Sequence, residues 1–395
     1  MKLPDTLGHL TYCLNIHATQ TYAEVMAALT GPAAEVKASV SPGDAFAIGL
    51  RFSGEALEEL ADPAKRAALK AALDEQNFQA VTVNGFPYGR FHGTRVKEEV
   101  YQPDWRSEER VRYTNALADL MAELASEGEM VSLSTVPGTF KPLAVGAEAV
   151  IAENILRSVA HLIALEAKTG VTIALAIEPE PACFLETIAE TVAFFSAHLF
   201  SAAAAARVAD LTGLGSEQAA SALPRHLGLC YDVCHAAVEY EDPVASIAAL
   251  RKAGIPVHKL QLSAALLIPS VTAGARAALV PYAEPTYLHQ VIRRTPDGLK
   301  SEVDLPDALA LGESTDGEEW RVHFHVPVFI RNLGAFSSTR DFLASILALH
   351  RQDPISPHLE VETYTWDVLP KDLRGATVAE NIGRECAWVL GELTR

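Results

Sequence analysis

The stretch TIALAIEPEP (172–181) is an apolar run of strand length that ends in two glutamates, each followed by a proline. Apolar runs with polar residues near their ends recur in LCYDVCH (229–235), KLQLS (259–263) and HLEVETYTW (358–366). The polar residues near the ends of these runs are Glu178, Asp232, His235, Gln261, Glu360 and Glu362. Buried carboxylates are costly unless a partner compensates their charge. Their position at the carboxyl ends of successive strands is typical of the active site of a (β/α)8 barrel.

Strand-like runs alternate with helical stretches along the chain, and this alternation predicts a parallel sheet with helices around it. Strands are expected at 9–16, 46–52, 78–84, 130–136, 172–178, 227–234, 257–263, 321–329 and 358–364. Helices are expected at 55–75, 107–126, 147–169, 185–207, 215–223, 243–253, 338–350 and 377–394. The predicted fold class is α/β, a (β/α)8 TIM barrel with an extra C-terminal helix. Because such a barrel has room for only eight of these strands, either 257–263 or 321–329 lies outside it.

Residues 265–320 are rich in Pro, Gly, Ala and Ser, which predicts an insertion over the barrel mouth. We expect a helix near 282–293 within it, an acidic stretch at 312–319 and an added β-hairpin. A second insertion, 84–105, is aromatic-rich and longer than an ordinary βα loop, with a packed Ω-loop as the alternative. The whole chain, 1–395, is expected to form a single domain.

The composition limits the classes of partner. A formal net charge of −18 repels nucleic-acid phosphates and anionic lipid headgroups, so we expect no nucleic-acid partner. The cysteines are scattered and odd in number, which predicts reduced thiols in a cytoplasmic protein. Cys230 and Cys234 can be interpreted as metal ligands, but their positions favour small core residues.

No targeting or membrane segment is predicted. The amino-terminal sequence MKLPDTLGHLTYCLNIH (1–17) lacks the apolar core of a secretory signal. No run of about twenty apolar residues occurs, so we expect no membrane insertion.

Asp232 and His235 form the most specific pair of candidate metal ligands. An acid and an imidazole three positions apart, where a strand turns into its loop, can both face one cation. Carboxylate and imidazole ligands suit Zn, Mn, Co or Fe, and Mg is a further candidate for the divalent metal. The alternative is that Asp232 caps the next helix and His235 is an ordinary core histidine. The neighbouring strand ends favour the metal.

Glu178, Glu360 and Glu362 extend the predicted metal set. Pro179 cannot donate a ladder hydrogen bond, so the strand ends there, and a carboxylate buried at that point needs a cation or a proton. One of Glu360 and Glu362 is expected to bind the metal and the other to bind substrate or act as a base. The alternative is a pair of glutamates on an exposed edge strand. Glu178 and Glu362 are the candidate catalytic residues, and either can also be a ligand.

Gln261 is the weakest member of the predicted metal set, although a buried glutamine must find partners. His323 and His325 share a face and either supply an imidazole to the site or lie on the surface of the insertion. Candidate substrate contacts near strand ends are His17, Arg51, Asn84, Tyr88, His92 and His325, with ordinary loop residues as the alternative.

These runs carry a resemblance. TIALAIEPEP, LCYDVCH and the late LEVET resemble the xylose-isomerase-like barrels of sugar phosphate isomerases and epimerases. The resemblance implies a Glu, an Asp-x-x-His, a further His and a final Glu around one divalent metal. Glu178, Asp232, His235 and one of Glu360 or Glu362 match this set. Gln261 stands where the further His is expected, unless His323 or His325 takes that place.

A closer resemblance covers nearly the whole chain. The strings that carry it are HLTYCLNIH (9–17), VNGFPYG (83–89), YQPDW (101–105), YDVCHAAVEYEDP (231–243), KLQLSAAL (259–266), HFHVPVF (323–329) and HLEVETYTWDVLP (358–370). They are similar to the EboE group of metabolite traffic proteins from the ebo gene clusters of bacteria and algae. Those clusters are implicated in moving secondary-metabolite precursors toward the periplasm. The resemblance implies a barrel that acts with other ebo-cluster proteins.

Two hypotheses of function follow, from different classes. The first is a metal-dependent isomerase or epimerase that acts on a small oxygenated metabolite. The second is a non-catalytic binding or trafficking module that keeps the pocket without turnover. A third hypothesis, an apurinic endonuclease on the same barrel, is disfavoured by the net charge of −18. Dinucleotide-binding, P-loop, α/β-hydrolase and zincin motifs are missing from the sequence.

Overall fold

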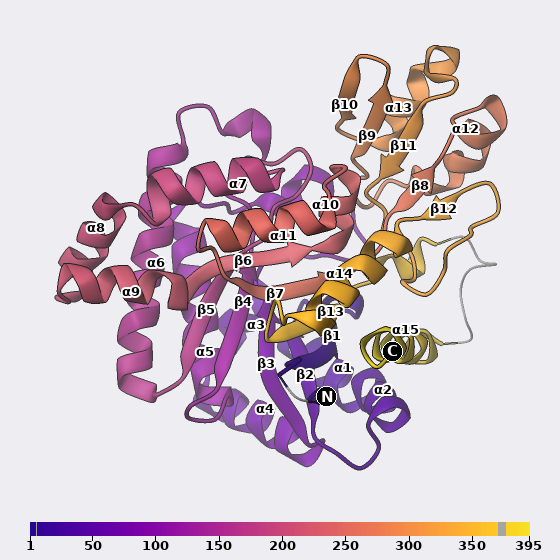
Figure 1. Cartoon of the computed structure of the whole chain (residues 1–395). Helices are drawn as coiled ribbons and strands as arrows, with labels where there is room; N and C mark the ends of the chain where they lie inside the picture. The colour runs from indigo at the N-terminus through magenta and orange to yellow at the C-terminus, as the bar shows by residue number, and fades with distance from the viewer. Residues whose placement is uncertain (5, 370–376) are drawn as a thin grey trace.

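The structure of the protein is a computed structural model that describes residues 1–4, 6–369 and 377–395 (Figure 1). Within these residues eight parallel strands form a nearly closed barrel, which confirms the predicted fold class. The strands are β1 (His9–Tyr12), β2 (Phe46–Arg51), β3 (Phe78–Asn84), β4 (Met130–Thr135), β5 (Thr172–Ile177), β6 (Leu227–Asp232), β7 (Val257–Leu262) and β13 (His358–Val361). They pair in the order β1-β13-β7-β6-β5-β4-β3-β2, and a parallel bridge between Cys13 and Gly49 joins β1 to β2.

Helices follow the strands and lie outside the barrel (Figure 1). They are α1 (Tyr22–Thr30), α2 (Pro32–Val40), α3 (Gly54–Glu59), α4 (Pro63–Glu75), α5 (Glu108–Leu124), α6 (Glu148–Thr169), α7 (Ile188–Phe194), α8 (Ala202–Thr212), α9 (Ser216–His226), α10 (Val233–Val238), α11 (Pro243–Lys252), α14 (Arg340–Gln352) and α15 (Val378–Leu393). Short turns occur at η1 (Leu14–Ile16), η2 (Lys97–Tyr101), η3 (Lys141–Leu143), η4 (Phe195–Leu199) and η7 (Tyr364–Asp367). Ser107 caps α5, and Gly170 ends α6 with a φ of 72°, where glycine avoids the steric penalty of a side chain.

Two predicted helices are broken. The helix expected at 55–75 is divided into α3 and α4, because Pro63 starts a new helix that Asp62 caps. The helix expected at 185–207 is divided into α7, the π-helical turn η4 and α8, which Ser201 caps. Helices α1 and α2 had no counterpart among the predicted helices.

A second sheet lies between β7 and β13 in the chain. Its strands are β8 (Leu266–Ile268), β9 (Val291–Thr295), β10 (Gly298–Glu302), β11 (Glu319–Val322) and β12 (Ser337–Ser338), and α12 (Ala273–Leu279), η5 (Val280–Tyr282), α13 (Leu305–Ala310) and η6 (Gly312–Thr315) connect them. The sheet is antiparallel in the order β10-β9-β11-β8-β12, and β9 and β10 form the expected hairpin. The seventh barrel strand is therefore β7, and β11 is the extra strand.

The helix predicted near 282–293 is wrong. That range holds the end of η5, an irregular segment and the start of β9, while α12 lies earlier, at Ala273–Leu279. Residues 291–295 pair with β10 on one side and β11 on the other, so tertiary pairing overrides the local helical pattern. The single-domain organisation stays a prediction.

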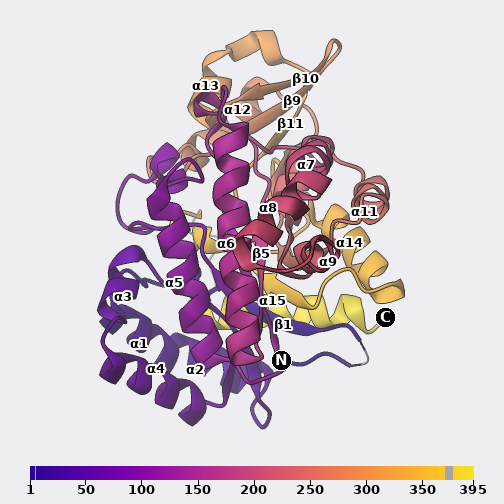
Figure 2. The ribbon, with the colours of Figure 1, turned by 90° about the vertical axis from the view of Figure 1, so that its left-hand side faces the viewer.

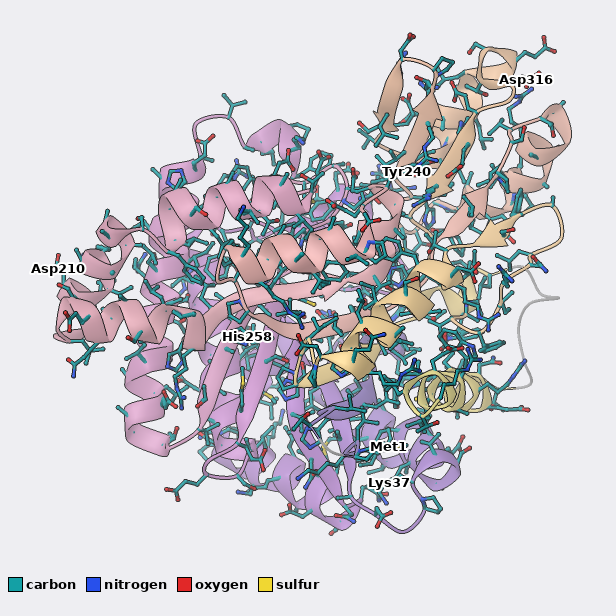
Figure 3. All side chains as sticks on the ribbon, in the orientation of Figure 1. Met1, Lys37, Asp210, Tyr240, His258 and Asp316 are labelled. Carbon is teal, nitrogen blue, oxygen red and sulfur yellow. The ribbon has the colours of Figure 1, made fainter. Side chains whose placement is uncertain are left out.

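The second sheet is attached to the barrel next to α10. Figure 1 shows β9, β10 and α13 as a lobe at the upper right, and Figure 2 shows this lobe at the top of the molecule. Figure 3 places Tyr240 where the barrel meets the lobe. Its hydroxyl donates to the carbonyl of Glu319 at 3.0 Å, and the Arg321 guanidinium lies 3.9 Å from its ring centre. These contacts hold the residues after β11 close to the barrel mouth.

All five cysteines are free and buried. Among the described residues no single helix is long and apolar enough to cross a membrane, although Ile188–Leu199 and Ala202–Thr212, bent by 53°, together meet that test of length and composition.

Candidate metal centre

Three carboxylates meet at the carboxyl ends of three barrel strands. Glu178 follows β5, Asp232 ends β6, and Glu362 follows β13. One oxygen from each lies within 4.8 Å of the other two, and all three side chains are buried. We call these three residues the carboxylate cluster.

Asp232 has two roles that the sequence presented as alternatives. Its Oδ1 accepts from the backbone N–H of His235 at 2.9 Å, which caps α10, and from the hydroxyl of Ser263 at 2.8 Å. The cap turns the chain so that Nε2 of His235 lies 3.9 Å from Oδ2 of Asp232. Capping therefore uses one carboxylate oxygen and leaves the other directed into the site.

Two carboxylate oxygens of the cluster are buried without a hydrogen-bond partner among the described residues: Oδ2 of Asp232 and Oε2 of Glu178. A buried acceptor without a partner is destabilising, and an ionised one is more so. Burial raises the pKa of Glu178 well above its ordinary value, and the nearby charges of Glu362 and Asp232 act in the same direction. The cluster therefore needs a cation or a proton, and an oxygen-rich set of this kind fits a divalent metal.

Glu362 is held in place by two asparagines. Asn15 and Asn84 donate to its Oε1 at 2.5 and 3.1 Å. Burial and the neighbouring charge of Asp232 raise the pKa of this carboxyl. Asn84 was predicted as a substrate contact, whereas Asn15, in η1 after β1, was not singled out by the sequence.

Glu360 lies elsewhere in the barrel and has its own cation. Nζ of Lys259 is 2.6 Å from its Oε1, and both side chains are fully buried. Gln261 donates to the same oxygen at 3.1 Å, and its side chain also acts against the raised pKa of Glu362, so it lies between the two glutamates. Gly49 leaves the space for the Glu360 carboxylate, because a Cβ there would lie 1.6 Å from Oε2. Glu362, not Glu360, belongs to the carboxylate cluster, and Lys259 within the apolar strand KLQLS was an available signal for an internal ion pair.

Three histidines converge beside the cluster. His323 and His325 follow β11 and are buried, not exposed on the insertion. Ring centres of His235 and His323 are 4.6 Å apart, and those of His323 and His325 are 5.2 Å apart. Burial lowers the pKa of His325 to about 4 and that of His323 well below its ordinary value. Neutral imidazoles are the form that binds metals.

Further groups of metal-ligating atoms overlap at this place. Three such groups are Glu180 with His235 and His323, Asp232 with His235 and His325, and Cys234 with His323 and His325. Within each group, one ligand atom from each residue lies within 4.8 Å of the other two. Glu180, whose pKa is raised by burial, accepts from the hydroxyl of Tyr101 at 2.8 Å. Glu180 is the second glutamate of TIALAIEPEP, but nothing in the sequence indicated the approach of Tyr101 from the second insertion.

The site opens into a pocket of about 530 Å³, counting its open mouth. Its polar lining is Asn15, Asn84, Lys97, Glu178, Glu180, His235, His323, His325 and Glu362. Aromatic side chains form much of the remaining wall: Phe86, Phe91, Tyr101, Tyr287 and Tyr364.

Other predicted substrate contacts lie outside this lining. Arg51 donates to the carbonyls of Thr19 and Pro87 at 2.9 and 3.2 Å, and the Tyr88 hydroxyl donates to Glu109 at 2.9 Å. His17 pairs with the hydroxyl of Tyr12 at 3.2 Å, and His92 with that of Tyr287 at 2.7 Å. Arg51 braces two loops, while the roles in substrate binding stay predictions.

Comparison with known proteins reveals likeness of structure without likeness of sequence. No protein-family model and no curated protein matches the sequence. A xylose isomerase-like TIM barrel protein from Mycobacterium smegmatis, solved in complex with magnesium, matches with a TM-score of 0.50 and 10% identity over 98% of this chain and 97% of its own. The chain shares the TIM-barrel fold of this xylose isomerase-like protein.

Two further solved structures match this chain less well. The IOLI protein with a bound zinc atom has a TM-score of 0.47 and 12% identity over 98% of each chain. The probable 3-DHS dehydratase AsbF from Bacillus anthracis has a TM-score of 0.47 and 12% identity over 97% of this chain and 98% of its own. At such identities the comparisons describe the fold, and the chemistry rests on the site.

Proposed function

We propose that this xylose isomerase-like barrel binds a divalent metal ion through Glu178, Asp232 and Glu362 and acts on a small oxygenated metabolite as an isomerase or epimerase. The observation that carries this proposal is the pair of unpartnered oxygens, Oε2 of Glu178 and Oδ2 of Asp232, buried within 4.8 Å of a third carboxylate. Zn, Mn, Co, Fe and Mg all remain compatible with these ligands.

When bound, the metal ion would supply Lewis-acid polarisation of a substrate carbonyl or hydroxyl. Glu178 and Glu362 line the pocket, whereas Asp232 does not, so the first two are the carboxylates that a substrate can reach. Asn15 and Asn84 hold Glu362 through Oε1. We assign to Glu178 or Glu362 the movement of a proton between adjacent substrate carbons.

The pocket favours an uncharged substrate with a ring or another apolar face. Lys97 is the one lysine or arginine in the described lining, and its Nζ lies 2.6 Å from Asp304 and 3.2 Å from the carbonyl of Glu284. Such a neutralised ammonium is a poor partner for a phosphate. Hydroxyl groups facing the carboxylates and an apolar face against the aromatic wall match the lining better.

The resemblance to the EboE group supports a place for this reaction in the processing or traffic of secondary-metabolite precursors. Under this proposal the physiological partners are a small metabolite and other ebo-cluster proteins. A trafficking module that binds the metabolite without turnover is the competing outcome, and metal-free protein that still binds the metabolite would favour it.

The test is the metal content of the purified protein, measured by inductively coupled plasma mass spectrometry after equilibration with Mg²⁺, Mn²⁺ or Zn²⁺. We expect Glu178→Gln and Asp232→Asn to lower the metal affinity by about tenfold or more, because each removes a charged ligand. Glu239→Gln is the matched control, since this carboxyl has a pKa raised by burial to about 8 but lies in none of the ligand groups. Metal affinity equal in all three variants and the parent would exclude the carboxylate cluster as the metal site.

A further inference from the structure

His235, His323 and His325 come from two distant parts of the chain and meet at the barrel mouth. His235 lies in α10, and the other two follow β11 of the second sheet. Their exposed fractions are 5%, 3% and 1%, so the three rings share a site that is almost closed to solvent. The proposed function uses none of these imidazoles.

Two of the rings are fixed by backbone carbonyls through Nδ1. Nδ1 of His235 lies 2.8 Å from the carbonyl oxygen of Pro179, and Nδ1 of His325 lies 2.5 Å from that of Glu362. A carbonyl oxygen only accepts hydrogen bonds, so each Nδ1 carries the hydrogen. In the neutral ring Nε2 then has a lone pair, which is the usual arrangement in a metal-binding histidine.

The third ring is fixed in the same way by a side-chain amide. Nδ1 of His323 lies 2.6 Å from Oε1 of Gln290. The orientation of this amide follows from its other end, because Nε2 of Gln290 donates to the carbonyl of Pro181 at 2.9 Å and to Glu180 at 3.1 Å. Both of those partners are acceptors, so Oε1 faces His323 and Nδ1 of His323 is the donor. Nε2 of His323 therefore also has a lone pair.

Nε2 of His323 and Nε2 of His325 face each other at 3.3 Å. Two lone pairs at this separation repel unless a positive ion lies between them. In tetrahedral coordination, zinc–nitrogen distances of about 2.0–2.1 Å place two ligand nitrogens about 3.3–3.4 Å apart. The spacing of these two nitrogens is thus the spacing of a zinc-bound pair.

Two overlapping groups of candidate ligand atoms place a carboxylate beside these imidazoles. Atoms of Glu180, His235 and His323 lie within 4.8 Å of one another, as do atoms of Asp232, His235 and His325. The first of these groups shares no residue with the carboxylate cluster of Glu178, Asp232 and Glu362. Asp232 belongs both to the second of these groups and to the carboxylate cluster.

We propose that His235, His323 and His325, with Glu180, form a second metal site, the imidazole site, distinct from the carboxylate cluster. Imidazole-rich ligands select Zn²⁺ or Co²⁺ over Mg²⁺. The second sheet thereby supplies two ligands to a centre that the barrel alone cannot complete.

The experiment is a titration of the chelator-treated full-length protein with Zn²⁺ alone, followed by equilibrium dialysis and metal analysis. We expect about two equivalents of zinc in the parent and about one in His323→Asn and in His325→Asn. Asparagine keeps an amide N–H where Nδ1 stands and removes Nε2, so the contacts to Gln290 and Glu362 are retained. His226→Asn is the matched control, because this buried ring lies 2.8 Å from the Ile173 carbonyl through Nδ1 but belongs to no ligand group.

The two proposals fail in different ways. Loss of zinc in the Glu178→Gln variant alone, with full binding in both histidine variants, would overturn the imidazole site and imply that the two rings share a proton. Loss of zinc in the histidine variants alone would support the imidazole site and count against the carboxylate cluster. If the variants do not fold, zinc-edge X-ray absorption of the parent decides: imidazole scattering is expected, and its absence would overturn the site.

Discussion

Glu360 and Glu362 are two positions apart in sequence, but they have different environments. Glu360 faces Lys259 inside the barrel, and Glu362 faces Asn15 and Asn84 at its mouth. An alternating pattern assigns both to one side of a strand but does not give their depth. The difference separates a residue that stabilises the barrel from one that lines the pocket.

At the residue scale we predict that Glu360→Gln is strongly destabilising. It leaves the fully buried ammonium of Lys259 without its charge partner, which costs about 3–5 kcal/mol of unfolding free energy. Urea denaturation of the metal-free protein measures this. The double variant Lys259→Met, Glu360→Gln should recover most of the loss, because it removes both charges. A double variant as unstable as the single one would contradict the ion-pair explanation.

At the element scale, α15 braces the two loops that carry His325 and Glu362. Oε1 of Glu385 accepts from the backbone N–H of Val328 at 3.1 Å and from the hydroxyl of Thr363 at 2.6 Å. Val328 lies three residues after His325, and Thr363 directly follows Glu362. The predicted C-terminal helix therefore stabilises the site as well as covering the barrel, because the buried Glu385 side chain connects it to the loop after His325 and to the loop after Glu362.

The pH dependence of the free energy of unfolding should reveal the contribution of the Glu385 carboxyl. Burial raises the pKa of Glu385 from 4.5 to about 7, although Thr363 and Val328 act in the opposite direction. Between these values the folded protein holds a proton that the unfolded chain has released, so stability falls as pH rises through this window. The loss attributable to Glu385 is roughly 3 kcal/mol, complete above about pH 7.

Urea denaturation of the metal-free parent and of Glu385→Gln at several pH values between 4.5 and 7 measures this contribution. The variant should show a shallower decline, whatever its stability at any one pH, since glutamine does not titrate. Parallel curves for the two proteins would show that Glu385 has an ordinary pKa.

At the scale of the whole molecule, the net charge and the fold together determine which macromolecules can approach the site. The chain carries a formal charge of −18, and the one lysine or arginine in the described pocket lining, Lys97, is paired with Asp304. Proteins that bind DNA neutralise its phosphates with lysine and arginine.

We therefore predict that a duplex with an abasic site is neither bound nor cut. Fluorescence polarisation at low salt should give a dissociation constant weaker than about 10⁻⁴ M, the weak end of ordinary non-specific DNA binding. Gel analysis with added Zn²⁺ should show intact strands, with a known apurinic endonuclease as the positive control. Zinc-dependent cleavage that Asp232→Asn abolishes would replace the isomerase proposal with a nuclease.

Much of the barrel was predictable because its signals are local. Alternating apolar runs and helices predicted the parallel barrel, and polar residues at strand ends indicated Glu178 and Asp232 but left Glu360 and Glu362 as alternatives for one ligand. The helix expected near 282–293 failed because the pairing of β9 with β10 and β11 is not visible in a local pattern.

The sequence by itself determined the barrel and the presence of acids and histidines at its mouth, since strand periodicity and strand ends depend on neighbouring residues. Only the tertiary structure decided which of these groups meet. Asn15 reaches Glu362 across 347 positions because barrel closure brings β1 beside β13. His323 and His325 reach His235 because the second sheet attaches beside α10. Contacts of this kind depend on closure and docking, which no single stretch of sequence encodes.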